Sequence, residues 1–113
     1  MSIPNPKFQI FKGANSEYYF RLTARNGEII LASEGYTSKQ SCFGGIVSVK
    51  QNASDERRYD NRTASNGQFY FVLTAANGQI IGVSEMYTTR SARDNGIKSV
   101  MANAPIAPVE DLT

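Results

Sequence analysis

The stretch that decides the fold occurs twice in the chain. Residues 19–37 read Tyr-Phe-Arg-Leu-Thr-Ala-Arg-Asn-Gly-Glu-Ile-Ile-Leu-Ala-Ser-Glu-Gly-Tyr-Thr, and residues 70–88 read Tyr-Phe-Val-Leu-Thr-Ala-Ala-Asn-Gly-Gln-Ile-Ile-Gly-Val-Ser-Glu-Met-Tyr-Thr. The offset of 51 residues holds without a gap from the pair Lys7/Arg58 to the pair Ala53/Ala104. The chain is therefore a tandem duplication. We divide its single domain, 1–113, into one repeat at 7–56 and another at 57–113.

Residues 18–25 predict the first strand of a hairpin. Apolar and polar side chains alternate along them, which is the pattern of a strand with one buried face. The inward-facing row is Phe20, Leu22 and Ala24 in the first copy and Phe69, Phe71, Leu73 and Ala75 in the second. Residues 7–12 also alternate and predict a further strand ahead of this hairpin.

The pair Asn26-Gly27 predicts how the first hairpin turns, and the second copy repeats the pair. Both residue types tolerate positive φ, so we expect a two-residue type I′ loop with residues 28–33 as the returning strand. In that register Arg25 lies opposite Glu28. Ile30 then points to the helix-free face, away from the inward row.

A helix is predicted to follow, from Ser38 to Asn52 and, in the second copy, from Thr88 onward. Thr37 can cap the first helix, with Gln40 at the reciprocal capping-box position. The apolar stripe consists of Cys42, Gly45, Ile46, Val49 and Ala53, and its counterpart includes Ala92, Gly96, Ile97 and Val100. A mid-helix glycine is destabilising by roughly 1 kcal/mol relative to alanine. Its recurrence in both copies therefore indicates close packing against the sheet.

Neither copy alone can bury its apolar face, since one hairpin and one helix are too few. Two copies related by a pseudo-two-fold axis can share a single sheet. We therefore expect an α+β fold with one mostly antiparallel sheet and two helices on one face. The extended segments after the helices, 57–62 and 109–112, are expected to pair with strands of the other copy.

The composition excludes several classes of site. The chain has no histidine and one cysteine, Cys42, so a zinc site of Cys and His cannot form and the commonest general base is missing. Cys42 lies on the apolar helix stripe, where a thiol acts as a small hydrophobe rather than a nucleophile. A lone cysteine and an N-terminus without a signal-peptide pattern predict a cytoplasmic protein. The net charge of +2 is too small to indicate a partner, and we assign no catalytic, cofactor or metal residue.

The duplicated motifs resemble one known family. Phe-x-Leu-Thr-Ala-x-Asn-Gly-x-Ile-Ile, Ser-Glu-x-Tyr-Thr and Gly-Ile-x-Ser-Val-x-x-Asn each occur twice, and this is similar to the YegP-like family of small, uncharacterised bacterial proteins. The resemblance covers residues 7–112. It implies tandem β-β-β-α-β repeats in one sheet with exchanged C-terminal strands. It brings no established activity and hence no catalytic residues.

Two surfaces are candidates for binding. The helix-free sheet face is expected to present aromatic, arginine and threonine side chains, namely Tyr19, Arg21, Thr23, Arg25, Tyr70 and Thr74. On the first helix, Phe43 and Val47 lie off the apolar stripe, where the second helix has Asp94 and Lys98. Residues four apart share one side of a helix. Phe43 and Val47 therefore form either a small contact patch or a local packing site against a terminus.

The residues leave the function open among three classes. A non-enzymatic binding or accessory module, with a protein, a small molecule or a second copy as partner, follows from these surfaces and from the lack of a catalytic constellation. A weak single-stranded nucleic-acid binder is the first alternative, because Tyr19, Arg21 and Tyr70 on an open sheet can stack bases and contact phosphates. A carboxylate-dependent enzyme is the second, and it requires Glu34 and Glu85 to converge in one cleft. No membrane is expected as a partner.

Overall fold

The computed structural model describes residues 3–113, which hold seven strands and two α-helices. In chain order the elements are β1 (Lys7–Lys12), β2 (Tyr18–Thr23), β3 (Ile29–Ala32), α1 (Lys39–Asn52), the 3₁₀ turn η1 (Glu56–Arg58), β4 (Tyr59–Thr63), β5 (Phe69–Thr74), β6 (Ile80–Val83), α2 (Arg90–Asn103) and β7 (Val109–Asp111). The predicted strands and helices are all present, and their ends lie within two residues of the predicted ones.

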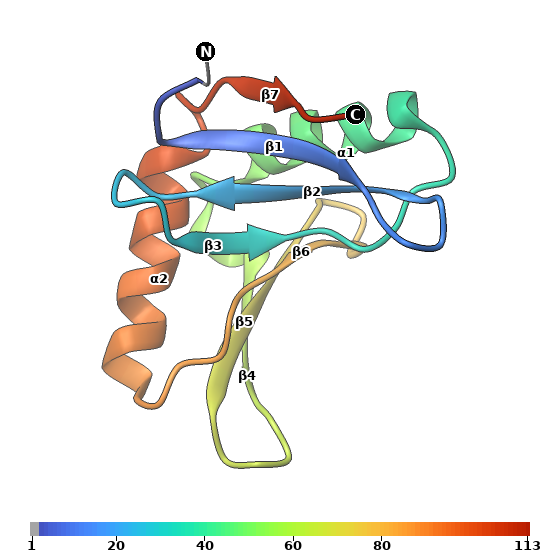
Figure 1. The fold of residues 1–113 in the computed structure, drawn as a ribbon. Coiled ribbons are helices and arrows are strands. Elements are labelled where there is room, and N and C mark those ends of the chain that lie inside the picture. The colour runs from blue at the N-terminus through green and yellow to red at the C-terminus, as the bar shows by residue number, and fades with distance from the viewer. Residues whose placement is uncertain (1–2) are drawn as a thin grey trace.

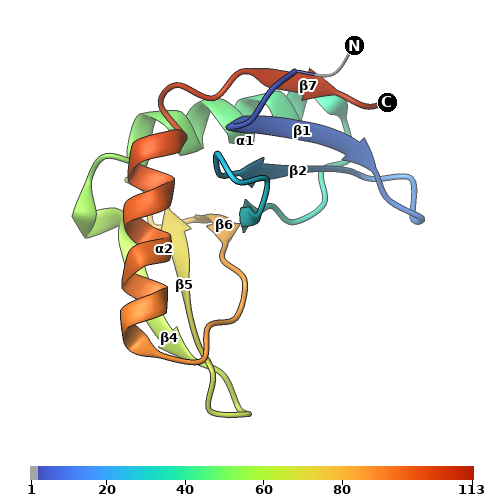
Figure 2. The same ribbon diagram turned by 60° about the vertical axis from the view of Figure 1, so that its left-hand side comes forward.

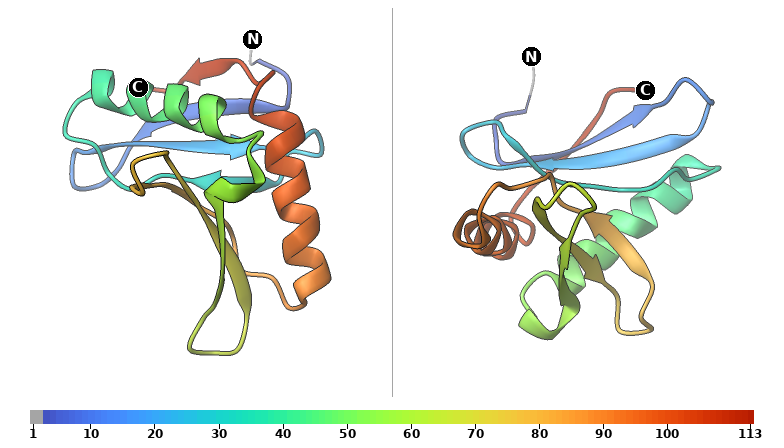
Figure 3. Two further views of the ribbon diagram at one scale, coloured as in Figure 1. Left: turned by 180° about the vertical axis from the view of Figure 1, so that it is seen from behind. Right: turned by 90° about the horizontal axis from the view of Figure 1, so that it is seen from below.

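The strands form one sheet in the order β4-β5-β6-β3-β2-β1-β7. Neighbouring strands are antiparallel, except that β1 and β7 are parallel. The sheet is strongly twisted (Figure 1). Helix α1 contacts β2, β5 and β6, and α2 contacts β3 and β5, so both pack on the inward rows of the sheet (Figure 3). The predicted α+β class, the mostly antiparallel sheet and the single helical layer are confirmed.

A pseudo-two-fold axis relates the two copies, as predicted. In the first copy Phe8 of β1 lies opposite Leu22 of β2. In the second, Tyr59 of β4 lies opposite Leu73 of β5, and both residues are offset by 51 positions from the first pair. The two hairpins therefore share one register, and the axis passes between β3 and β6, where the halves of the sheet meet.

As predicted, the strand after α1 pairs with a strand of the second copy and the strand after α2 pairs with a strand of the first, but the two pairings differ. β4 follows α1 and lies antiparallel to β5, in the place that β1 holds on β2. β7 follows α2 and lies parallel to the outer edge of β1 (Figure 2). Consequently β1 is covered on its outer side. No strand within residues 3–113 pairs with the outer side of β4.

One hydrophobic core lies between the sheet and both helices. Its buried members include, from the sheet, Phe8, Ile10, Phe20, Leu22, Ile30, Leu31, Phe71 and Leu73, and, from the helices, Cys42, Ile46, Val49 and Val100. Apart from Ile30, these residues confirm the central part of the predicted inward rows and helix stripes. Because both copies contribute to one cluster, the core belongs to the whole chain.

The Asn26-Gly27 turn is present, but the predicted two-residue type I′ loop is wrong. Gly27 has a φ of +85°, whereas Asn26 has no positive φ. The Gly27 N–H donates to the carbonyl of Ala24, and the Ala24 N–H donates to the carbonyl of Glu28, both at 2.9 Å. Ala24 rather than Arg25 therefore lies opposite Glu28. The loop has three residues and ends on a left-handed glycine, the second commonest hairpin connection.

This longer loop introduces a bulge into β3. Leu22 lies opposite Leu31, as predicted, and the next pair along is Thr23 and Ile29. Ile30 thus has no partner on β2, and the alternation of faces shifts by one residue at this point. Ile30 is only 5% exposed and belongs to the core. Its predicted place on the helix-free face is wrong for this reason.

Each helix is capped one residue later than predicted. Ser38 rather than Thr37 is the N-cap of α1, and its Oγ accepts a backbone N–H at 3.1 Å. Thr89 caps α2 in the same way at 3.0 Å. Tyr36 still pairs with β2, so the chain leaves the extended conformation only after Thr37. The capping box predicted for Thr37 and Gln40 is therefore wrong.

Close packing at the mid-helix glycines is confirmed, and tyrosines provide the contact. A Cβ atom on Gly45 would overlap the hydroxyl of Tyr36 and lie 2.8 Å from its Cζ. A Cβ atom on Gly96 would lie 2.7 Å from the Cζ of Tyr87. The tyrosines of the two Ser-Glu-x-Tyr-Thr motifs therefore rest against the helices where only glycine fits.

Candidate functional site

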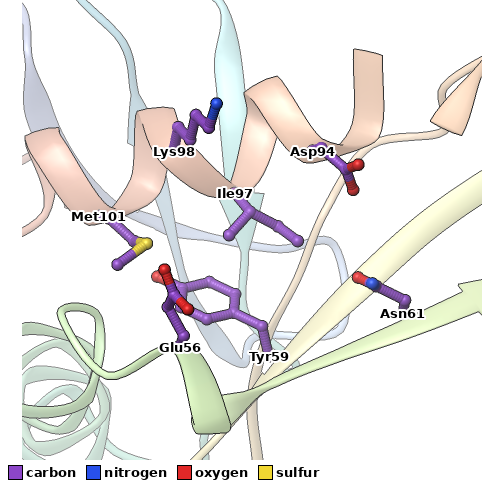
Figure 4. A pocket seen from close by; sticks show the side chains of 7 residues that line it. All are labelled: Glu56, Tyr59, Asn61, Asp94, Ile97, Lys98 and Met101. Atoms are coloured by element: carbon purple, nitrogen blue, oxygen red, sulfur yellow. The ribbon is translucent and has the colours of Figure 1, made fainter. Parts of the chain in front are cut away.

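A groove lies between β4 and α2. Its volume is ≈ 380 Å³, and it is lined by Glu56, Tyr59, Asn61, Asp94, Ile97, Lys98 and Met101. Figure 4 shows Ile97 and the Tyr59 ring pointing toward one another, with Asp94 and Asn61 at one end and Glu56 and Met101 at the other. The Lys98 ammonium turns away from Tyr59 (Figure 4). The groove thus has an apolar middle and a carboxylate near each end.

Tyr59 is fixed in position as the floor of this groove. Its hydroxyl donates a hydrogen bond of 2.6 Å to the carbonyl of Ala53. Its ring meets the Phe71 ring edge to face, with centroids 5.7 Å apart. Burial raises the pKa of the Tyr59 hydroxyl above its ordinary value, so the residue is neutral and offers an apolar surface at physiological pH.

The equivalent groove in the first copy is covered by the chain itself. The seven positions 51 residues earlier are Asn5, Phe8, Ile10, Phe43, Ile46, Val47 and Lys50. Phe8 and Ile10 are 0% exposed, whereas their counterparts Tyr59 and Asn61 are half-buried and exposed. β7 accounts for the difference, since it pairs with β1.

Backbone hydrogen bonds join β7 and its flanks to β1. The Phe8 N–H donates to the carbonyl of Pro108, and the Leu112 N–H donates to the carbonyl of Ile10, both at 2.8 Å. The backbone groups of Phe8 and Ile10 therefore point away from β2. Because the hairpins share one register, the backbone of Asn61, which corresponds to Ile10, points away from β5 in the same way.

Lysines of the first copy hold the acidic β7 segment in place. The contacts are Lys7 to Glu110 at 3.0 Å, Lys39 to Asp111 at 3.1 Å, and Lys50 to the carbonyl of Ala107 at 2.6 Å. Hydrogen bonds from Gln9, from the Ile3 backbone and from Lys7 lower the pKa of Glu110 to about 2. Hydrogen bonds from Thr113 and Lys39 lower the pKa of Asp111 to about 2. Both carboxylates are thus ionised and bonded at neutral pH.

On the helix-free face, the polar groups predicted for binding are bonded within the chain. The Arg21 guanidinium lies 4.7 Å from the centroid of Phe11, and its Nε donates to Gln9 Oε1 at 2.8 Å. Tyr19 stacks on the same Phe11 ring with centroids 5.7 Å apart. Thr23 is only 5% exposed and its hydroxyl is hydrogen-bonded, so its predicted place on an open surface is corrected.

Two of the remaining predicted residues lie in the other half of the sheet. Tyr70 is half-buried on β5, and Thr74 donates to the carbonyl of Arg58 at 3.0 Å. β3 and β6 separate β5 from β2, which corresponds to roughly 14 Å at the usual strand spacing. Arg25 is exposed on the first hairpin loop. The structure therefore does not gather the six predicted residues into one site.

The predicted patch on α1 is exposed, at 38% for Phe43 and 51% for Val47. These residues correspond to Asp94 and Lys98 of the groove in the second copy. They therefore belong to the wall beside β7. The apolar pair Phe43 and Val47 thus lies beside the groove whose floor β7 covers, and the charged pair Asp94 and Lys98 lies beside the groove that β7 does not reach.

Cys42 is free and fully buried. Burial, with a contribution from the charge of Asp111, raises the pKa of the thiol to about 11. A thiol in this state is protonated and out of contact with solvent, which fits packing rather than nucleophilic chemistry.

Glu34 and Glu85 lie in different parts of the molecule. Antiparallel pairing of Ala32 with Val83 places them about four residues apart along the strand direction, or roughly 13 Å. A hollow of ≈ 550 Å³ is lined by Glu34, Gly35, Tyr36, Gly78, Gln79, Ile80 and Ile81, without Glu85. Carboxylates that act as an acid–base pair on one bond lie about 5–9.5 Å apart. We therefore propose no shared catalytic role for Glu34 and Glu85.

Residues 3–113 also lack two further kinds of site. No three His, Cys, Asp or Glu side chains of this range gather closely enough to hold a metal ion. None of its helices has the length and apolar character needed to cross a bilayer.

The groove between β4 and α2 was not predicted from the sequence. The signal for it was the change from Phe43 and Val47 to Asp94 and Lys98 between the copies. This change was interpreted as a patch on α1. The change is explained only by the pairing of β7 with β1. That long-range contact leaves no local pattern in the sequence.

Comparisons with known proteins agree with the fold. The family model described as a domain of unknown function (DUF1508) matches residues 14–60 and again 64–111. A UPF0339 protein of Bordetella pertussis is 57% identical over 92% of this chain and 94% of its own. UPF0339 protein YegP of Escherichia coli K12 is 52% identical over 94% of this chain and 96% of its own.

Two solution NMR structures are also similar to this chain. That of YegP from E. coli, described as a protein of unknown function, has a TM-score of 0.91 and 50% identity and covers 100% of this chain and 97% of its own. That of a UPF0339 protein from Shewanella oneidensis has a TM-score of 0.89 and 48% identity, over 95% of this chain and 91% of its own.

Proposed function

Since this chain belongs to the DUF1508 family, a domain of unknown function, we propose its role from the geometry: a non-enzymatic module that binds an extended polypeptide segment in the groove between β4 and α2. The segment adds as a strand to the outer edge of β4. Recognition of this kind combines backbone hydrogen bonds with pockets for alternate side chains. The bacterial relatives and the free, buried Cys42 support a place in the bacterial cytoplasm.

The observation that carries this proposal is β7. An extended segment of this chain already fills the equivalent groove of the first copy, in parallel with β1 and with hydrogen bonds of 2.8 Å to it. In the second copy β4 keeps the same register on its hairpin partner, the backbone of Asn61 takes the place of Ile10, and Tyr59 and Ile97 form an apolar floor. The N–H of Tyr59, in the place of Phe8, donates to the carbonyl of Glu56. A site that suits a strand in one copy is thus presented to solvent in the other.

The helix-free face supports a nucleic-acid function less well. Arg21 is engaged by Gln9 and by the Phe11 ring, so binding a phosphate would require breaking contacts that the chain already makes. The predicted aromatic residues lie in two separate halves of the sheet. For the groove, by contrast, the outward backbone groups of β4 have no strand partner among residues 3–113.

Selection from a peptide library tests the proposal. Ten-residue peptides that keep the sequence Ala-Pro-Val of residues 107–109 and vary elsewhere would be selected against the full-length protein. When the enriched peptides are added, the backbone chemical shifts of residues 59–63 and 97–101 of the protein should change. The amide of Asn61 should become protected from hydrogen exchange. Absence of enrichment, or shifts confined to other surfaces, would overturn the proposal.

A matched pair of variants provides the control. Asn61→Pro removes the outward N–H and obstructs an added strand, while proline is tolerated at solvent-facing positions of edge strands. Asn61→Ala keeps the N–H. Enriched peptides should bind the alanine variant and fail to bind the proline variant. Equal binding by both would show that they do not add as a strand to β4.

A further inference from the structure

We infer that the segment bound in this groove belongs to another protein and carries Asp or Glu two residues after an apolar residue that lies over Tyr59 and Ile97. This inference rests on the proposed function and specifies its partner. The counterpart groove of the first copy holds a segment with the same pattern, in which Val109 is followed two residues later by Asp111. A cation binds that carboxylate, and the second copy keeps a cation at the same place.

The position of the acidic residue follows from the pairing of β7 with β1. Asp111 lies opposite Ile10, and Ile10 corresponds to Asn61 of β4. Because the two hairpins share one register, a segment that runs parallel to β4 places its acidic residue opposite Asn61. The apolar residue two positions earlier then lies opposite Tyr59, on the same face of the added strand.

The backbone of β4 also favours recognition at this end of the groove. The Tyr59 N–H already donates to the carbonyl of Glu56. The outward backbone groups of Asn61 have no strand partner within residues 3–113. The hydrogen bonds that a bound segment can form are therefore centred on Asn61, next to the proposed acidic residue.

The cation that binds Asp111 in the first copy has a counterpart in the second. The Nζ of Lys39 lies 3.1 Å from a carboxylate oxygen of Asp111, and the residue 51 positions later is Arg90. Arg90 is exposed, its Cζ lies 5.1 Å from the centroid of the Phe69 ring, and it forms no salt bridge within residues 3–113. A guanidinium can bind a carboxylate through two parallel hydrogen bonds. Arg90 is therefore available to a carboxylate of a bound segment.

The other charges that the second copy adds at this end cancel. Arg93 and Asp94 take the places of two uncharged residues, Cys42 and Phe43. Arg93 is only 8% exposed, and its guanidinium lies 3.3 Å from the Asp94 carboxylate. Arg90 therefore still decides the sign of the charge at this end, and a carboxylate opposite Asn61 complements it.

The position between the apolar and the acidic residue has no such charge preference. In β7 it is Glu110, whose carboxylate accepts from Lys7 at 3.0 Å and from Gln9 at 2.8 Å. In the second copy Arg58 takes the place of the lysine, but Asp60 takes that of the glutamine and, when ionised, cannot donate. These two changes oppose each other. Recognition by charge is thus confined to the acidic residue that follows.

The strand β7 of a second copy is disfavoured as the occupant. Each chain has one β7 and two grooves of this kind, so exchange of β7 between molecules opens one groove for each that it fills. The exchanged strand would also lose the hydrogen bond from Gln9 to Glu110, because Asp60 stands in the place of Gln9. A segment of another protein adds hydrogen bonds to β4 without this loss.

Three synthetic peptides test the inference on the full-length protein by NMR titration. One has the sequence of residues 104–113, and the others are the same peptide with Asp111→Asn and with Asp111→Lys. Affinity for the groove is measured from the backbone chemical shifts of residues 59–63 and 90–98. It should fall about two- to fivefold with asparagine, the range expected when one exposed ion pair is lost, and further with lysine. The attached β7 should stay on β1, because a tethered segment has a high effective concentration, so the shifts of residues 7–12 should change little.

Variants of Arg90 separate recognition of the charge from addition of the strand. Arg90→Gln should make the affinities of the aspartate and asparagine peptides equal. Arg90→Lys, which introduces the lysine of the first copy, should keep the preference for aspartate. Arg25→Gln removes the same charge from an exposed hairpin loop that does not line the groove, and it should leave the preference unchanged.

The contrary outcomes can be told apart. Equal affinity of the three peptides in the groove, or tighter binding of the lysine peptide, would overturn the acidic preference and leave strand addition standing. Failure of all three to bind in the groove would overturn the inference, whereas the proposed function fails only if the peptide library also yields no binder there. Dimerisation of the protein through β4, seen by sedimentation velocity over a concentration series, would overturn the choice of another protein as the partner.

Discussion

Two adjacent glycines in α1 have opposite roles. A Cβ atom on Gly45 would overlap Tyr36 and lie 3.0 Å from Phe20, whereas Gly44 has no neighbouring atom within 4 Å. Gly44→Ala should therefore raise the free energy of unfolding by roughly 0.5–1 kcal/mol, through helix propensity alone. Gly45→Ala gains the same propensity but overpacks a filled site, and should lower the free energy of unfolding by about 1–3 kcal/mol. Urea denaturation at equilibrium measures both.

The second copy supplies an independent check at the same scale. Gly96 faces Tyr87 as Gly45 faces Tyr36, so Gly96→Ala should be destabilising to a similar extent. If Gly45→Ala and Gly96→Ala both proved as stable as the natural protein, the tyrosines would have to be free to move. The close contacts between the tyrosines and the helices would then not be the reason that glycine occupies positions 45 and 96.

At the scale of elements, the attachment of β7 should depend on pH. The pKa values of Glu110 and Asp111 are lowered to about 2 in the folded protein, whereas unfolded carboxyl groups titrate at about 4. A lowered folded pKa contributes stability that is present above the unfolded pKa and is lost as the pH falls toward the folded one. The free energy of unfolding should therefore fall between about pH 4.5 and 2, in part because these two carboxylates become protonated.

A double variant isolates this contribution. Denaturant midpoints would be measured from pH 7 to 2 for the natural protein and for Glu110→Gln with Asp111→Asn. The variant should be less stable at pH 7 and lose less stability on acidification. Glu28→Gln, at an exposed carboxylate next to the first hairpin loop, serves as the control. The same acid dependence in the natural protein and the double variant would mean that β7 is held by packing and backbone bonds alone.

The elements show which parts of the fold a sequence can predict. The alternation of apolar and polar residues in 18–25 was sufficient to predict the strands, and the apolar stripe was sufficient to predict the helices. Both periodicities are local properties of the sequence. The hairpin loop was misjudged, since Asn-Gly suits both a type I′ turn and a three-residue loop with glycine in the left-handed position. One extra loop residue shifted the alternation and moved Ile30 into the core. The helix caps were displaced by one residue because the bridge between Tyr18 and Tyr36 extends the strand region.

The same limit applies to the site at the scale of the whole molecule. The duplication predicted one sheet shared by two copies, and this is confirmed. It did not predict that β7 would cover one copy and not the other, because that asymmetry arises from a contact between opposite ends of the chain. Without it, Phe43 and Val47 appear as an isolated patch rather than as the exposed wall of a groove whose floor β7 covers. The division at 7–56 and 57–113 remains a prediction, and it can be tested directly.

The two halves should fold only together. α1 contacts β6 and α2 contacts β3, each across the axis, and Leu31 lies within 2.6 Å of where a Cβ atom on Gly82 would be. β7 of the second half covers β1 of the first. The fragment 1–56 alone therefore exposes most of a core built for two copies. We expect neither 1–56 nor 57–113 to unfold cooperatively as a monomer, and we expect an equimolar mixture to form one native-like complex.

Cys42 reports this assembly, because it is fully buried in the intact fold and its thiol has a pKa of about 11. A thiol reagent at pH 8 should label the fragment 1–56 rapidly and the 1:1 complex slowly, at the rate at which the complex opens. The intact chain sets the slow limit, and its urea-unfolded form sets the fast one. Slow labelling of monomeric 1–56, together with a cooperative unfolding transition, would show instead that one repeat buries its own core. The duplication would then join two independent domains rather than complete a single one.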